Sequence, residues 1–263
     1  MLRVALAAAF VGLLFVPEAE ANYCPRVLHR ATRLVVVLVP HVSSPKGTMR
    51  TFERKSPSAR WEGRSDPEPA VVGARGIAWG HPFQSFAKVG EPLKREGDKR
   101  TPAGIYRFGS SFGFAAASRA DHIRLEPGRH YCVGDARSPH YGRIVEKRVA
   151  GEKTSGEDMA AFPLYKRGLV IEYPPLRRAQ AGSCIFLHVT GGEGVGTAGC
   201  VALPEPRVAH LQGWAKDRHT VIAILHEDAV ARFKSCLPLT EVASGAEERA
   251  AIPLPTPKRR EVR

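Results

Sequence analysis

Short apolar runs separated by turn residues dominate the chain. The most apolar run, residues 34–39, is rich in β-branched side chains and ends at Pro40, which predicts a buried strand. Further runs of strand length follow at residues 76–79, 104–108, 167–173, 184–189 and 220–225. Gly, Pro, Asp and Ser clusters separate these runs, so the pattern predicts a mainly β protein.

Helical periodicity is clearest over residues 205–216. Val208, Leu211 and either Trp214 or Ala215 recur there at helical spacing, behind Pro204 and an acidic first turn. We therefore expect one or two short helices packed on a sheet. Residues 55–69 have the composition of an exposed loop.

The first residues have the plan of a secretory signal peptide over residues 1–21. Arg3 precedes an apolar stretch over residues 4–16, and Ala19-Glu20-Ala21 is a small-x-small cleavage site. The apolar stretch is shorter than the ~20 residues that a membrane-spanning helix needs. We predict cleavage after Ala21, with an uncleaved anchor as the alternative. The mature protein is then expected in the periplasm or cell wall, with no stable membrane span after cleavage.

The rest of the chain divides into three parts. A short N-terminal lead over residues 22–33 precedes a folded domain over residues 34–236. Residues 237–263 form a basic, Pro-containing tail that from Ser244 onwards is too poor in apolar residues to order itself.

Charge favours an anionic partner. The chain has 39 Lys and Arg residues against 26 Asp and Glu residues, a formal charge of +13. Nucleic acid, a wall polymer and a lipid surface all fit this charge. An aromatic and basic platform of the kind that binds nucleic acid is missing, so we expect no nucleic-acid partner.

Five cysteines at positions 24, 132, 184, 200 and 236 leave one thiol over if the rest pair in an oxidising compartment. Four paired cysteines allow three connectivities, which the sequence does not distinguish. Cys24 and Cys236 flank the predicted core and are placed to tie its two ends.

The most informative segment for chemistry spans residues 183–204. His188 ends an apolar run, a Gly-rich connection follows, and Cys200 comes directly after Thr-Ala-Gly. A nearby imidazolium lowers the pKa of a thiol and creates a thiolate that attacks carbonyls. A purely structural histidine at the edge of the core is the alternative. Phosphate-binding and zinc-binding spacings are both absent, so we expect no metal site.

Three further segments, together with the one that contains His188 and Cys200, form a series of motifs along the chain. The series GDKRTPAG, CVGDARSPHYGRIV, FPLYKRGLVIEY and IFLHV…GTAGCVALP resembles the L,D-transpeptidase catalytic domain of the YkuD type. The resemblance spans roughly residues 34–225 and makes residues 34–236 the expected catalytic domain. It implies a β-sandwich or barrel-like sheet that carries the cysteine loop at its mouth.

The resemblance also implies roles for individual residues. Cys200 would be the nucleophile and His188 the general base and acid, with the backbone carbonyl of Val189 orienting the imidazole. Backbone N–H groups of Cys200 and Gly199 would stabilise the oxyanion. No metal or organic cofactor is implied.

The implied reaction is acyl transfer on peptidoglycan stem peptides. The thiolate attacks the carbonyl at the L-centre of a diamino acid, expels D-alanine and leaves a thioester. The amine of a second stem, or of an anchored outer-membrane or wall protein, then resolves the thioester. Water in place of the amine gives an L,D-carboxypeptidase, and a catalytically silent wall-binding module is a further alternative.

One departure from the family pattern concerns substrate binding. Many relatives have an arginine two residues after the cysteine, where this chain has Ala202. Arg100, Arg143 or Arg167 would then have to supply the positive charge for a substrate carboxylate. Asp98, Arg100 and His140 are the substrate-binding residues that we expect.

Overall fold

The computed structural model describes residues 24–117, 119–174, 181–192, 195–215 and 219–238. The predicted signal peptide lies outside these residues. Of the predicted tail, only the first two residues are described.

Strands are the main elements, in two sheets. The large sheet contains β1 (Arg33–Val39), β2 (Lys46–Glu53), β3 (Glu62–Gly63), β4 (Glu68–Val71), β5 (Ile77–Trp79), β6 (Thr101–Gly113), β7 (Ile123–Arg124), β11 (Arg167–Ile171), β12 (Phe186–Val189), β13 (Val201–Leu203) and β14 (Thr220–His226). The small sheet has the order β10-β8-β9, formed by Gly156–Asp158, His130–Val133 and Ile144–Glu146.

Helices are few and short. The α-helices of the described residues are α1 (Lys147–Ala150), α2 (Glu205–Trp214) and α3 (Glu227–Val230). Short 3₁₀ helices lie at Arg26–Leu28, His81–Phe86, Met159–Ala161, Pro163–Lys166 and Ala231–Phe233. No helix among the described residues has both the length and the apolar character that crossing a membrane requires.

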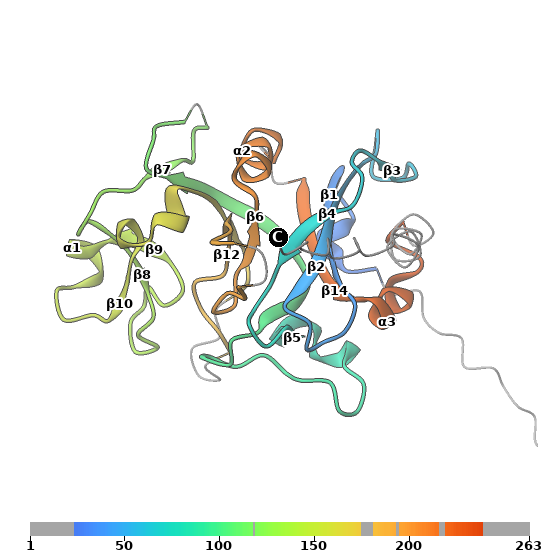
Figure 1. Cartoon of the computed structure of the whole chain (residues 1–263), viewed down its shortest axis with the longest axis horizontal. Coiled ribbons are helices and arrows are strands. Elements are labelled where there is room, and N and C mark those ends of the chain that lie inside the picture. The colour runs from blue at the N-terminus through green and yellow to red at the C-terminus, as the bar shows by residue number, and fades with distance from the viewer. Residues whose placement is uncertain (1–23, 118, 175–180, 193–194, 216–218, 239–263) are drawn as a thin grey trace, which may run out of the picture.

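The large sheet closes on itself. Its strands follow the order β1-β14-β6-β11-β12-β13-β4-β2, and β2 pairs again with β1. A sheet that closes in this way has no long free edge, and its inward side chains form one core. Figure 1 shows the small sheet to one side, with β6 and β12 lying between β8–β10 and the β1–β14 region.

β1 and β14 form the centre of the core. Every residue from Leu34 to Val39 is buried, and so is every residue of β14. The two strands pair in parallel along their whole length, and β2 pairs antiparallel to β1 on the other side. A strand enclosed in this way buries both faces, which explains why its sequence is a continuous β-branched run.

The longest strand, β6, links this core to the second cluster of buried side chains. Its first half pairs with β14 and its second half pairs with β11. Phe112, near its end, packs in a separate buried cluster with Phe186, Tyr165 and Cys200.

Disulfides connect the parts of the chain in two places. Cys24 is bonded to Cys236, and Cys132 in β8 is bonded to Cys184, just before β12. The structure describes all five cysteines of the chain, and Cys200 is the one left as a free thiol.

The sequence prediction of a mainly β barrel or sandwich is confirmed, and the described residues contain three short α-helices where one or two were expected. All six predicted strands are present, although β6 extends from 101 to 113 rather than 104 to 108. The predicted strand over 184–189 begins only at Phe186, because Cys184 has a φ of 54° that ends regular extended structure. The predicted loop over 55–69 is wrong in part, since it contains β3 and the start of β4.

Candidate active site

Two parallel strands bring Cys200 and His188 to one face. In the pairing of β12 with β13, Leu187 lies beside Val201 and His188 beside Ala202. Cys200 comes one residue before β13, so it lies beside Phe186. Phe186 is two residues before His188 on β12. Alternate residues of a strand point to the same face, so the side chains of Cys200 and His188 are diagonal neighbours across the pair.

The backbone at Cys200 is fixed by two threonines. The hydroxyls of Thr101 and Thr197 donate to the Cys200 carbonyl at 2.9 Å and 2.7 Å. Thr101 also accepts a hydrogen bond from the Gly73 N–H at 2.8 Å. These bonds connect the start of β6 directly to the backbone of the cysteine.

Gly199 allows the chain to turn into Cys200. Its φ is 150°, and a Cβ added there would lie 3.2 Å from the Arg100 carbonyl oxygen. A larger residue would therefore be strained and would press on the backbone of the 98–101 turn. The Gly199 N–H donates to the Thr197 hydroxyl at 3.1 Å, so binding of an oxyanion by this amide would compete with that bond.

The Cys200 thiol is buried, at 7% exposure. Its hydrogen-bond acceptor is the Cys184 carbonyl oxygen, 3.6 Å from Sγ. Burial raises the pKa of the Cys200 thiol to about 12, although the Phe186 backbone N–H lowers it. At neutral pH the resting thiol is therefore protonated.

His188 is also buried and is held by its own strand. Its Nδ1 lies 2.8 Å from the carbonyl oxygen of Val189. A carbonyl only accepts, so Nδ1 carries the proton and Nε2 keeps its lone pair. Burial lowers the pKa of His188, although this bond raises it. The resting pair is therefore a neutral thiol and a neutral imidazole, rather than the thiolate and imidazolium that the sequence chemistry favoured.

Tyr165 covers the histidine. Its ring meets His188 edge to face, with 5.2 Å between ring centroids, and also packs on Phe186 and Phe112. Its hydroxyl donates to Oε1 of Glu157 in β10 at 2.9 Å. Burial raises the pKa of the Glu157 carboxyl above its usual value. This contact joins the small sheet to the face that carries Cys200.

A cavity of about 400 Å³ opens beside Cys200. Its charged walls come from the turn before β6 and from β10. The residues that line it are Lys94, Glu96, Gly97, Cys132, Gly134, Gly156, Glu157, Phe162, Tyr165, Ser183, Cys184, Ile185, Ala198, Gly199 and Cys200. A site of this size takes a small ligand or the end of a peptide.

Asp98 organises the charged turn rather than facing the cavity. Its carboxylate accepts from the Arg95 and Arg100 N–H groups at 2.8 Å and 2.9 Å, and from the Lys94 ammonium at 2.6 Å. Arg100 donates to the carbonyls of Val42, Arg75 and Ile77. Its guanidinium is thus used to hold backbone, and the cation that lines the cavity is Lys94.

The other predicted binding residues lie apart from the cavity wall. His140 and Arg143 belong to the turn between β8 and β9, where the Arg143 N–H donates to the His140 carbonyl at 3.0 Å. Arg167, in β11, lies 3.4 Å from Gln212 and 3.6 Å from Glu205 of α2. None of the three is among the described residues that line the cavity beside Cys200.

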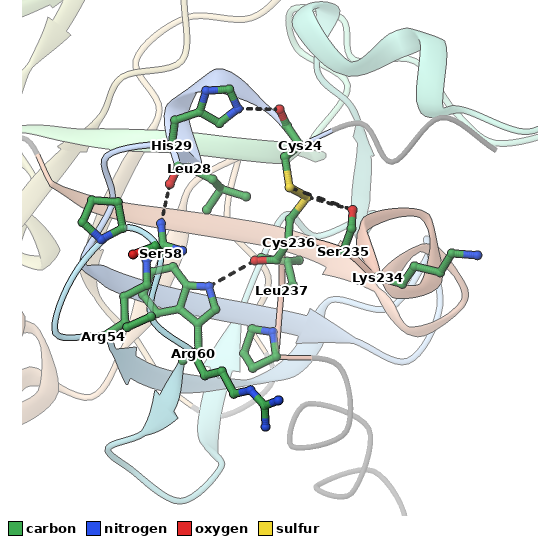
Figure 2. Close-up of a pocket in the computed structure, with 14 residues that line it drawn as sticks. Cys24, Leu28, His29, Arg54, Ser58, Arg60, Lys234, Ser235, Cys236 and Leu237 are labelled. Carbon is green, nitrogen blue, oxygen red and sulfur yellow. Dashed lines mark hydrogen bonds between the residues drawn. A yellow bond between two sulfur atoms is a disulfide. The ribbon is translucent and has the colours of Figure 1, made fainter. Parts of the chain in front are cut away.

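A larger cavity, of about 730 Å³, lies at the Cys24–Cys236 disulfide (Figure 2). There His29 contacts the Cys24 carbonyl, and Arg54 donates to the Leu28 carbonyl at 2.6 Å. It contains neither the free thiol nor His188. Chemistry rather than size therefore identifies the smaller cavity as the candidate active site.

Sequence reasoning missed Lys94, Glu157, Thr101, Thr197 and Tyr165 as parts of the site. Thr101 and Tyr165 lie inside the motifs GDKRTPAG and FPLYKRGLVIEY, and Thr197 is in GTAGC, so a motif signal was present for these three. Lys94 and Glu157 lie outside the quoted motifs, and only the folding of the turn and of β10 onto the cavity brings them to Cys200.

The family model of the L,D-transpeptidase catalytic domain (YkuD) matches residues 41–224. No curated protein matches the chain. Among solved structures, Bd1075 from Bdellovibrio bacteriovorus is 18% identical, with 82% of this chain and 56% of that chain covered and a TM-score of 0.37. The helical cell shape determining protein Pgp2 from Campylobacter jejuni is 14% identical, with 74% and 48% covered and a TM-score of 0.34. The chain thus spans about half the length of these two proteins.

Proposed function

Because the chain belongs to the L,D-transpeptidase catalytic domain family of the YkuD type, we propose that it is a periplasmic cysteine L,D-transpeptidase acting on peptidoglycan stem peptides. One observation carries the proposal. The free cysteine of the chain lies on the same strand-pair face as a histidine whose Nδ1 is fixed by a backbone carbonyl, and it lines a cavity.

The first half of the reaction forms a thioester. His188 Nε2 takes the proton of the Cys200 thiol as Sγ attacks the carbonyl at the L-centre of the diamino acid. The tetrahedral intermediate collapses, and the imidazolium gives its proton to the leaving D-alanine amine. A thiolate and imidazolium formed together attract each other strongly in a buried site, which offsets part of the cost that burial imposes on each charge.

The second half regenerates the thiol. The amine of a second stem peptide attacks the thioester carbonyl and loses a proton to His188. The C–S bond then breaks, and the sulfur recovers its proton from the imidazolium. In both halves the Cys200 N–H is the backbone donor assigned to the oxyanion, and the Gly199 N–H joins it once its bond to Thr197 breaks.

Acylation by a carbapenem tests the assignment directly. The strained lactam carbonyl of a carbapenem is an electrophile for an activated thiol, and intact-mass spectrometry reads the adduct. We expect a single adduct on the protein with the Cys24–Cys236 and Cys132–Cys184 disulfides intact. We expect none on Cys200→Ala.

His188→Ala supplies the second arm, with His29→Ala as its matched control. His29 makes the same kind of side-chain contact to a carbonyl but lies at the distant cavity of Figure 2. Loss of a general base lowers rates by roughly 10²–10⁴-fold. Acylation should fall in this range in His188→Ala and stay unchanged in His29→Ala. Absence of an adduct on a thiol shown to be free would contradict the proposal.

Product analysis separates transfer from hydrolysis. With disaccharide tetrapeptides as substrate, a transpeptidase releases D-alanine and forms cross-linked dimers, whereas water as acceptor gives tripeptides alone. We expect dimers. Tripeptides without dimers, from a protein that still acylates at Cys200, would assign it as an L,D-carboxypeptidase instead.

A further inference from the structure

The cavity beside Cys200 is lined by one buried ammonium group. Lys94 is 4% exposed and lines the cavity together with the cysteine. Its Nζ donates to Oδ1 of Asp98 and to the carbonyl of Arg95, each at 2.6 Å. These bonds use two of the three N–H groups of an ammonium ion and fix the position of its charge.

Residues 182–184 pack against both Lys94 and the Cys200 thiol. A Cβ at Gly182, whose φ is 106°, would lie 3.0 Å from Lys94 Cε. Two residues later, Cys184 is tied to Cys132 and its carbonyl accepts from the Cys200 thiol. Lys94 and Cys200 thus lie against the same short stretch of backbone, residues 182–184.

The charges around the thiol are mostly negative. From β10, Glu157 lines the cavity and accepts from Tyr165, and from the turn before β6, Glu96 lines it and accepts from Tyr141. Asp98 lies behind Lys94, and His188 is neutral at rest. Among the described residues of the cavity wall, Lys94 is the one cation. Electrostatic interaction with Glu157 raises the pKa of Cys200, and interaction with Lys94 lowers it.

We propose that the Lys94 ammonium, held by Asp98, stabilises the Cys200 thiolate that forms when His188 takes the thiol proton. The inference rests on the proposed role of Cys200 as the nucleophile. Lys94 exchanges no proton and forms no bond to carbon or sulfur in this role. It supplies a positive charge that is itself buried, as the thiol is, so that solvent screens the interaction between them less than at the protein surface.

Alkylation of the thiol by iodoacetamide tests the inference without any wall substrate. Only the thiolate reacts, so at a pH below the thiol pKa the rate measures the thiolate fraction. Intact-mass spectrometry follows a single carbamidomethyl adduct on Cys200 between pH 7 and 9. Removal of a neighbouring cation shifts the pKa of a thiol upward by about one unit. Lys94→Met should therefore react about tenfold more slowly across this range.

Two further variants separate charge from structure. Lys99→Met removes a positive charge from an exposed position in the same turn and should leave the rate unchanged. Asp98→Asn keeps an oxygen for Lys94 and Arg100, which both bind Oδ1, removes the opposing charge, and loses only the Oδ2 bond from the Arg95 N–H. It should make alkylation faster, because the Lys94 charge is then less compensated.

The outcomes are distinct. Equal rates in Lys94→Met and Lys99→Met, or slower alkylation in both Lys94→Met and Asp98→Asn, would overturn the inference and leave Lys94 as a structural part of the turn. If Lys94→Met does not fold, the sign of the Asp98→Asn effect decides. Loss of carbapenem acylation alongside the expected alkylation rates would contradict the proposed function while supporting the role of Lys94.

Discussion

Thr101 shows how one side chain connects a sequence motif to the nucleophile. It lies in GDKRTPAG, is fully buried, and joins the Gly73 N–H to the Cys200 carbonyl. The motif can therefore affect the reaction by positioning the nucleophile, without contacting the substrate. Its threonine fixes the backbone of the cysteine, and its aspartate fixes Lys94.

Thr101→Val should lower both stability and acylation. Valine has the shape of threonine but leaves the buried Gly73 N–H without its partner, which costs about 1–3 kcal/mol. The Cys200 carbonyl keeps only its bond from Thr197. Small displacements of a reacting group reduce rates strongly, so carbapenem acylation should slow by at least about tenfold. Urea unfolding and intact-mass kinetics measure the two effects.

Thr101→Ser is the matched control. It keeps the hydroxyl and removes one methyl group, which costs on the order of 1 kcal/mol in a packed core. Acylation should therefore remain near the original rate. Equal slowing in the serine and valine variants would show that packing, rather than the hydrogen bonds, sets the position of Cys200.

At the scale of elements, the small sheet is attached to the site by a covalent bond and a hydrogen bond. The Cys132–Cys184 disulfide joins β8 to the residues before β12, and Tyr165 bonds to Glu157 of β10. Both attachments end on a residue that itself contacts the catalytic pair, since the Cys184 carbonyl accepts from the Cys200 thiol and the Tyr165 ring packs on His188. The small sheet is thus part of the wall of the site rather than an appendage.

Removal of this disulfide should affect stability and reactivity together. The bond closes a loop of 52 residues, for which the chain-entropy model gives a stabilisation of about 4 kcal/mol. Cys132→Ala with Cys184→Ala should lose about this much in urea unfolding. The Cys184 carbonyl, which accepts from the thiol, also loses its anchor, so carbapenem acylation should change in rate.

Cys24→Ala with Cys236→Ala is the comparison that isolates the local effect. This second disulfide has a sequence separation of 212 residues and lies at the cavity of Figure 2. Stability should fall here as well, while acylation below the unfolding temperature should keep its rate. Equal effects of the two pairs on acylation would show that the disulfides act only on global stability.

The elements that could be predicted from the sequence are those whose own pattern of apolar and polar side chains is enough to identify them. The run over 34–39 and the periodicity of Val208 and Leu211 gave a buried strand and α2 directly, because burial on both faces or on one face leaves a clear pattern. β2 was missed, because its pattern of partly buried polar residues becomes a strand only through pairing with β1 and β4. Closure of the sheet is a property of that pairing and has no signature in any single segment.

The residues of the candidate site also fall into two groups, those that local sequence features indicate and those that only the folded structure brings there. His188 and Cys200 could be named as candidates, because the end of an apolar run and a Gly-rich connection are local features and the resemblance to the family assigned them roles. The register of β12 with β13 then brings them together. Lys94, Glu157 and the neutral resting state depend on burial and on contacts between distant segments. No local pattern encodes these.

At the scale of the whole molecule, Glu91 ties the middle of the chain to its C-terminal part. Its carboxylate accepts two hydrogen bonds from Arg232 at 2.7 Å and 2.6 Å, and one from the Trp79 indole at 2.7 Å. The Lys88 N–H donates to it as well, and His226 at the end of β14 lies 3.1 Å away. These contacts connect three parts of the chain: β5, the segment between β5 and β6, and the residues at and after the end of β14.

This network predicts how folding stability depends on pH. The hydrogen bond from Arg232 is the main cause that lowers the pKa of Glu91 to about 2 in the folded protein, from 4.5 when it is unperturbed. A carboxyl with a depressed folded-state pKa stabilises the fold fully above its unfolded pKa. It loses that contribution as the pH falls from about 4.5 towards 2. The shift corresponds to about 3 kcal/mol at neutral pH.

Urea unfolding of the original protein and of Glu91→Gln between pH 7 and pH 2.5 measures this contribution. Other carboxyl groups titrate in both proteins, so the difference between the two curves isolates Glu91. We expect the original protein to be more stable at pH 7 and the difference to shrink below about pH 4.5. A difference that stays constant down to pH 2.5 would show that the fold gains nothing from the ionised form of Glu91. The link between β5 and the C-terminal segment would then rest on the apolar packing of Trp79 with Phe233.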